Sequence, residues 1–100
     1  MAEEDHAYLA WVRAQPCAAR ALGPCWGGIE AHHDRDMTGL ALRSHDHRAI
    51  PLCRRHHQHV DQAARGIFSG KTRDERRDFF EAALFDTRER WERWRAITWF

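Results

Sequence analysis

Apolar positions near the start of the chain recur with the period of a helix. Tyr8, Leu9, Trp11 and Val12 form a stripe at i, i+3 and i+4 spacings. This stripe predicts a helix over residues 3–14 that docks on the core. The pair Gln15-Pro16 is expected to end the helix, because proline lacks an amide hydrogen and cannot continue it.

A longer apolar stripe lies in the last third of the chain. Thr72 and Glu75 have the spacing of a capping box, in which each side chain bonds the other's backbone amide, and a helix is expected over residues 72–97. Its apolar face consists of Phe80, Ala83, Leu84, Thr87, Trp91 and Trp94. Such a face most often forms core, here against the N-terminal helix, and any uncovered part is expected to bind a second copy or a protein partner. Stacking on nucleic-acid bases is the alternative use of so many aromatic and arginine side chains.

Residues 16–66 show short elements separated by turns, with the turn signals Gly23-Pro24 and Gly27-Gly28 near their start. The expected elements are a loop over 17–28, a strand over 28–33, a polar loop over 34–47, a strand over 48–52, and a helix from 52–53 to 64–65. Pro51 restricts the second strand to a sheet edge or a strand end, and Gly66 fits a helix stop. The whole pattern predicts an α+β fold that is mostly helical.

Composition bounds the class of protein. One hundred residues predict one domain, 1–100, in which a bound metal is a common additional source of stability. The chain has 16 basic and 15 acidic residues, a balance that does not by itself indicate a nucleic-acid-binding protein. No apolar run is long enough for a bilayer, and the start, Met1–Asp5, is acidic, so we expect a cytoplasmic location. Reduced cysteines in that compartment favour metal binding over disulfides.

Two histidine doublets stand out in the middle of the chain. They are His32-His33 and His56-His57, and the second follows Cys53 with Cys-x-x-His spacing. Histidine is the commonest metal ligand and also a general base near neutral pH. Neighbouring residues on a strand point to opposite faces, so one residue of the first doublet is expected to be a ligand and the other a base. For a lone histidine, a buried ring bonded to backbone would be the preferred interpretation.

The string Asp46-x4-Pro51-Leu52-Cys53-x-x-His56-His57, preceded by His32-His33, resembles the HNH nucleases. It is most similar to a branch of phage and prophage proteins that includes the RecA-dependent nuclease and the DUF968-type proteins. The resemblance covers about Pro16 to Gly70 and implies a small, treble-clef-like ββα-metal core.

The resemblance implies roles for individual residues. It assigns His32 to the metal, His33 to the general base, and Asp46 to bracing the loop and the base histidine; capping a turn is the alternative for Asp46. His57 and Asp61 lie at i, i+4 on one helix face, where many relatives carry a third histidine in place of Asp61. His59 projects to the opposite side and is expected not to be a ligand.

The resemblance also implies a structural zinc site. It pairs Cys17 and Cys25 with Cys53 and His56, a set of three cysteines and one histidine that zinc accepts in tetrahedral sites. Seven residues separate the first two cysteines, whereas a zinc knuckle normally has a two-residue gap. Burial as small residues, or a disulfide, is the alternative for that pair.

We therefore expect hydrolysis of DNA phosphodiester bonds with one divalent ion, either magnesium, manganese, nickel or zinc, held by His32, His57 and Asp61. Arg54 and Arg55, at the helix start, are expected to contact DNA phosphates, and two solvated surface arginines are the alternative. Two other classes remain open. One is an inactive, zinc-stabilised nucleic-acid-binding module, and the other is an assembly module that works through the aromatic C-terminal helix.

Overall fold

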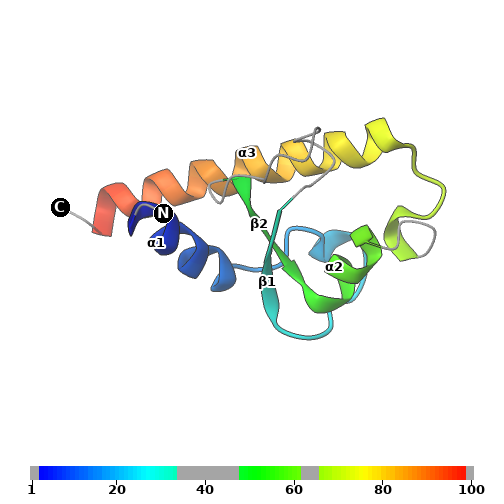
Figure 1. Ribbon diagram of the computed structural model, residues 1–100, viewed down its shortest axis with the longest axis horizontal. Helices are drawn as coiled ribbons and strands as arrows, with labels where there is room; N and C mark the ends of the chain where they lie inside the picture. Colours follow the sequence, from blue (N-terminus) through cyan, green and yellow to red (C-terminus); the bar gives the residue numbers. More distant parts are fainter. Residues whose placement is uncertain (1–2, 34–47, 62–65, 99–100) are drawn as a thin grey trace.

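A computed structural model of the chain (Figure 1) describes the backbone of residues 3–33, 48–61 and 66–98, and the side chains of residues 6–33, 48–60 and 66–97. The elements, in chain order, are α1 (Glu3–Arg13), the short 3-10 turn η1 (Arg20–Leu22), β1 (Ile29–His32), β2 (Ile50–Cys53), α2 (Arg54–Asp61), the 3-10 turn η4 (Gly66–Phe68) and α3 (Arg73–Thr98). The prediction of a small, mostly helical α+β fold is confirmed.

The two strands form an antiparallel sheet in the described part of the chain, with Ile29 opposite Cys53 and His32 opposite Ile50. The second strand therefore runs one residue further than expected. Because Leu52 and Cys53 pair with β1, α2 begins at Arg54 and not at residues 52–53. Pro51 lies in the middle of β2, opposite Ala31, and a two-stranded sheet offers it an edge on one side.

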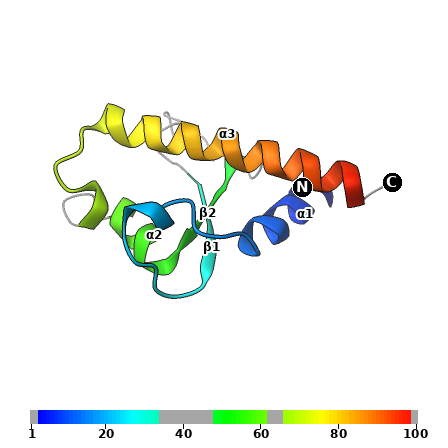
Figure 2. The ribbon, with the colours of Figure 1, turned by 180° about the vertical axis from the view of Figure 1, so that it is seen from behind.

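Helix α3 runs along one side of the molecule (Figure 1), and the other elements are arranged beneath it. Helix α1 lies under its C-terminal half, the sheet lies under its middle, and α2 lies on the far side of the sheet from α1. The view from behind (Figure 2) shows the same order of elements. None of the described helices combines the length and the apolar character that a membrane span requires.

The capping box begins α3 as the sequence predicts. The amide of Thr72 donates to Glu75 Oε1 at 2.9 Å, and the amide of Glu75 donates to Thr72 Oγ1 at 3.1 Å. The bond from the Thr72 amide lowers the pKa of the Glu75 carboxyl, which stabilises its charge next to the helix start.

The buried residues form two clusters, and α3 contributes to both. We call residues 17–28 the cysteine loop. The first cluster joins this loop to β2 and α3, and consists of Cys17, Ala19, Ile50, Leu52, Cys53, Phe80 and Leu84. The second joins α1 to α3 and consists of Tyr8, Leu9, Trp11, Val12, Ala49 and Trp91. All four residues of β2 are buried, so the strand is the centre of the fold.

Candidate metal centre

Four potential ligands meet where the cysteine loop, the end of β2 and the start of α2 come together. Cys17 and Cys25 come from the loop, Cys53 ends β2, and His56 lies in the first turn of α2. Their ligand atoms all lie within 4.8 Å of one another. The imidazole Nδ1 of His56 is 3.3 Å from Cys17 Sγ, 3.3 Å from Cys53 Sγ and 3.8 Å from Cys25 Sγ. We call these four residues the zinc-ligand group.

These distances fit a tetrahedral zinc ion. With Zn–S bonds of about 2.3 Å and Zn–N bonds of about 2.0–2.1 Å, a regular tetrahedron has S···N edges of about 3.6 Å. The three observed S···Nδ1 distances lie on either side of that value. The four residues are therefore compatible with structural zinc, as the sequence predicts.

The environment of His56 favours its neutral form, which is the form that binds a metal. His56 is fully buried, and desolvation, followed by the nearby His59 and Arg55, lowers the pKa of its imidazole. Its Nε2 atom has no hydrogen-bond partner among the described residues. A buried polar atom without a partner is costly, and an ion bound at Nδ1 would offset that cost by adding a strong interaction on the same ring.

The thiol groups favour a cation between them. Desolvation raises the pKa of Cys53, but the backbone amides of His56 and Trp26 outweigh it, so the pKa is lowered and the thiolate is stabilised. Desolvation and the neighbouring groups of Cys53 and Cys17 raise the pKa of Cys25 to about 11. Three thiolates this close repel one another, and a divalent cation removes that repulsion.

Backbone hydrogen bonds hold the cysteine loop against the sheet and α2. The amide of Ala18 donates to Pro51 O at 2.8 Å, the amide of Arg54 donates to Gly28 O at 3.0 Å, and the amide of Arg55 donates to Trp26 O at 3.1 Å. The first amides of α2 are thus engaged within the protein. Contact with DNA phosphates at this helix start stays a prediction, and the guanidinium groups of Arg54 and Arg55 would make it.

A second histidine group, separate from the zinc-ligand group, joins β1 to α2. The rings of His32, at the end of β1, and His57, on α2, have centroids 4.8 Å apart in an edge-to-face arrangement. His32 is buried, and its ring also contacts Phe80 of α3. The Nδ1 atom of His57 lies 2.8 Å from Glu30 Oε1. The structure therefore brings together two of the three predicted catalytic metal ligands.

The other predicted catalytic residues are placed only in part. His33 directly follows β1 and is half-buried. Asp46 lies outside the described residues, and Asp61 ends α2, but its side chain is outside the described part of the chain. Within the described side chains, the zinc-ligand group is the one set of three or more ligands close enough to share an ion. The catalytic ligand set stays a prediction.

Glu30 is a residue of the histidine group that the sequence did not predict. It occupies the same face of β1 as His32, because the two residues are two apart on a strand. That alternation was visible in the sequence as Glu30-x-His32 and could have indicated a carboxylate beside the histidine group. His59, predicted not to be a ligand, instead accepts a bond from the Ile67 amide at 3.5 Å.

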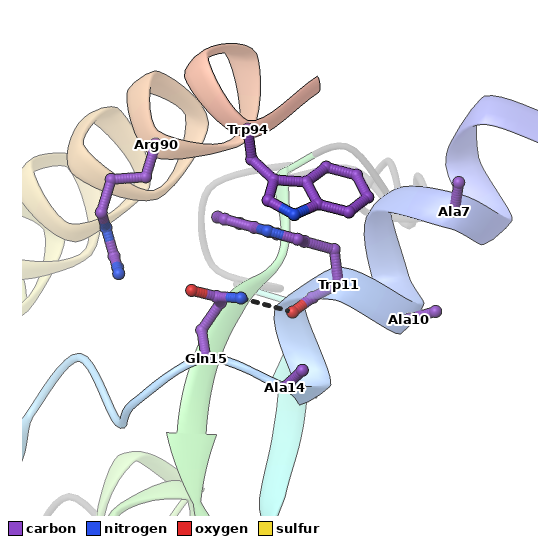
Figure 3. Close-up of a pocket in the computed structure, with 7 residues that line it drawn as sticks. All are labelled: Ala7, Ala10, Trp11, Ala14, Gln15, Arg90 and Trp94. Atoms are coloured by element: carbon purple, nitrogen blue, oxygen red, sulfur yellow. Dashed lines mark hydrogen bonds between the residues drawn. The ribbon is translucent and has the colours of Figure 1, made fainter. Parts of the chain in front are cut away.

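An open pocket of about 660 Å³ lies apart from both groups, between α1 and the C-terminal half of α3. It is lined by Ala7, Ala10, Trp11, Ala14, Gln15, Arg90 and Trp94. Figure 3 shows the rings of Trp11 and Trp94 next to each other at its wall, and their centroids are 6.5 Å apart. No residue that the sequence singled out as catalytic or metal-binding lines this pocket.

The elements and the four clustered ligands define the class as a small α+β protein with a group of three cysteines and one histidine compatible with structural zinc. The chain belongs to the DUF968 family, described as "Protein of unknown function (DUF968)", whose model matches residues 2–69. The prediction of a DUF968-type protein is confirmed.

The chain is also similar to "Uncharacterized protein YdfU" of Escherichia coli (strain K12), with 36% identity over 61 residues. The match covers 57% of this chain and 16% of that protein. No solved structure shows a significant match.

Proposed function

We propose that the protein is a metal-dependent endonuclease that hydrolyses DNA phosphodiester bonds and follows the HNH, ββα-metal plan. The observation that carries the proposal is the meeting of His32 and His57 at the β1–α2 contact, with ring centroids 4.8 Å apart. A strand and a helix each supply one imidazole to the same place. Core packing does not require two histidines to meet there.

The contact between His57 and Glu30 supports a role for His57 as a metal ligand. A carboxylate at Nδ1 fixes the ring orientation and leaves Nε2 as the ligand atom, as in the carboxylate–histidine–metal arrangements of many metal sites. His32, His57 and Asp61 would hold the ion. Imidazole and carboxylate ligands together suit manganese, nickel, zinc and magnesium.

In the proposed reaction, His33 takes a proton from a water molecule, whose oxygen attacks phosphorus. The new O–P bond forms as the bond from phosphorus to the 3′ oxygen breaks, and solvent protonates the leaving oxygen. The divalent ion supplies Lewis-acid stabilisation of the charge that develops on the phosphate. His33 directly follows His32 in the sequence, which supports its choice as the base.

Nicking of supercoiled plasmid tests the proposal. The native chain is expected to nick DNA when magnesium, manganese or nickel is added. His33→Ala is expected to lower the rate by about 10²–10⁴, the usual range for loss of a general base. His6→Ala is the matched control, because His6 is an exposed histidine of α1, away from the proposed site. Glu30→Gln should weaken metal binding, so half-maximal nicking should require a higher metal concentration.

Three results would count against this function. Equal nicking by the native chain and His33→Ala would show a wrong base or a contaminating nuclease. Loss of activity in His6→Ala as well would show damage to the fold and not loss of the base. No nicking by the native chain under any of the metals would leave an inactive nucleic-acid-binding or assembly module.

The assembly function has one observation in its favour. Helix α3 exposes Phe85 at 71% and Ile97 at 81% of their surface, and Trp94 is 39% exposed. Large apolar side chains left open on one helix favour a second copy or a protein partner. Light scattering over a range of protein concentrations, with Phe85→Ser and Ile97→Ser for comparison, tests this assembly directly.

A further inference from the structure

Trp26 is a large aromatic side chain that the fold leaves open to solvent. It lies in the cysteine loop, directly after Cys25, and 62% of its surface is exposed. Its carbonyl accepts the Arg55 amide at 3.1 Å, and its own amide lies against Cys53 Sγ. The backbone of Trp26 is therefore held by the end of β2 and the start of α2, while its ring takes no part in either buried cluster.

Gly27 brings this loop against Arg54. The backbone of Gly27 has φ 84°, and a Cβ atom built there would lie 2.7 Å from Arg54 Cβ and 3.6 Å from Arg54 Cγ and Cδ. The stem of Arg54 thus lies across the glycine that follows Trp26. The residue that follows Trp26 and the stem of Arg54 are therefore held next to each other by a contact that only glycine permits.

The surroundings of Trp26 carry positive charge. The cysteine loop contains Arg20, and the start of α2 carries Arg54 and Arg55. The acidic residues of the adjoining elements are Glu30 on β1, which contacts His57, and Asp61 at the far end of α2. Arg54 and Arg55 are exposed, and neither guanidinium forms an ion pair with a described residue. The chain as a whole is close to neutral, at +1, so this charge is a local feature.

We propose that Trp26, with Arg54 and Arg55 beside it, stacks on an unpaired base of single-stranded DNA while the arginines contact the adjacent phosphates. An exposed aromatic ring next to cationic groups is the usual arrangement for binding single strands, because every base offers a flat face. Duplex DNA keeps these faces inside the stack. The inference rests on the proposed function for the choice of DNA, and it adds a substrate feature to it, namely a single strand or a junction with unpaired bases.

Fluorescence anisotropy with labelled oligonucleotides tests the inference. A single strand and a duplex of the same sequence are titrated with the native chain, without added divalent cations, so that no cleavage occurs. The native chain is expected to bind the single strand more tightly. Trp26→Ala should weaken single-strand binding about 5- to 150-fold and change duplex binding less than about 2-fold, whereas Trp26→Phe should retain most of the affinity.

Two further variants make the result specific. Arg93→Ala removes an exposed cationic side chain from the C-terminal half of α3 and should leave both affinities unchanged. Arg54→Ala combined with Arg55→Ala should weaken binding to both DNAs and reduce the dependence of affinity on salt, because phosphate contacts release counterions. Zinc content and circular dichroism of each variant confirm that the fold is retained.

Unchanged single-strand affinity in Trp26→Ala would overturn the inference. Equal losses of affinity in Trp26→Ala for the single strand, for the duplex and for polyglutamate as a competing anion would also overturn it. Such losses would indicate a surface that recognises charge alone. The two proposals fail separately. Plasmid nicking without a Trp26-dependent single-strand preference would refute the stacking site only, and a Trp26-dependent preference without nicking would refute the nuclease only.

Discussion

Tyr8 is the only tyrosine of the chain, and its phenol lies buried between α1 and α3. Its hydroxyl donates to the carbonyl of Ala49 at 2.7 Å. The ring meets Trp91 edge to face, with centroids 5.4 Å apart, and the Arg88 guanidinium lies 4.8 Å from the ring centroid. One side chain thus connects α1, the residue before β2, and α3.

This burial predicts a pH dependence. Desolvation raises the pKa of Tyr8 from 10.0 to about 12, and the Arg88 charge opposes it only in part. In the unfolded chain the phenol ionises near pH 10, so the stability from the neutral, buried phenol is present below pH 10 and is lost as pH rises toward 12. Absorbance at about 295 nm should therefore show tyrosinate forming near pH 12 in buffer and near pH 10 in urea.

Because the chain has a single tyrosine, the absorbance step can be assigned without ambiguity. Tyr8→Phe should abolish the step and should weaken the fall in stability between pH 10 and 12. A midpoint near 10 in the folded protein would mean that the phenol is open to solvent.

At the scale of elements, the sequence predicted those that rest on local signals. The capping box of Thr72 and Glu75 placed the start of α3, and the stripe of Tyr8, Leu9, Trp11 and Val12 placed α1. The boundary between β2 and α2 was wrong, because it depends on the pairing of Cys53 with Ile29, a residue 24 positions earlier in the chain. Neither hydrophobic periodicity nor a turn residue marks that pairing.

The glycine pair in the cysteine loop gives a test at this scale. Gly27 has φ 84° and approaches Arg54 Cβ, whereas Gly28 has no atom within 4 Å of an added Cβ. Gly27→Ala is expected to lower the free energy of unfolding by about 1–2 kcal/mol from the left-handed backbone alone, with the contact to Arg54 adding to the loss. Urea denaturation measures the change.

Gly28→Ala is the matched control, one residue away and without positive φ or steric contact, and it should change stability by less than about 0.5 kcal/mol. Equal effects of the two substitutions would show that the loop does not hold Gly27 against Arg54.

At the scale of the whole molecule, the sequence predicted which cysteines and histidine meet, although the ligands lie in three separate segments. It did so through Cys53-x-x-His56 and the family resemblance, and not through any local signal that joins Cys17 to Cys53. The His32–His57 contact also follows from placing one doublet on a strand and the other on the next helix. The split of the core into two clusters, and the contact of Glu30 with His57, depend on three-dimensional packing that no single segment encodes.

The arrangement of α3 predicts that metal loss affects the entire molecule. Phe80 and Leu84 join the cluster at the zinc-ligand group, and Trp91 joins the cluster at α1, so the same helix closes both. Cys53→Ala should abolish bound zinc, measured by elemental analysis, and should destabilise the fold by several kcal/mol. On heating the native protein, zinc release and loss of the near-ultraviolet tryptophan signal should have the same midpoint.

His56→Cys provides the control, because it converts the zinc-ligand group to a set of four cysteines, which zinc also accepts, and it should retain zinc. Separate midpoints for zinc release and the tryptophan signal would show two cooperative units, and the predicted single domain 1–100 would be wrong. A native, reduced protein without tightly held zinc would refute the metal centre itself.

The position of α3 has one more consequence. The match to the family ends at residue 69, and α3 begins at Arg73. The matched segment therefore contains every member of the zinc-ligand group, but it lacks the helix that covers Ile50 and Leu52. A family member with a different sequence after this segment needs another apolar surface there. The segment that the family shares thus depends, in this chain, on an element outside the match to cover its apolar surface.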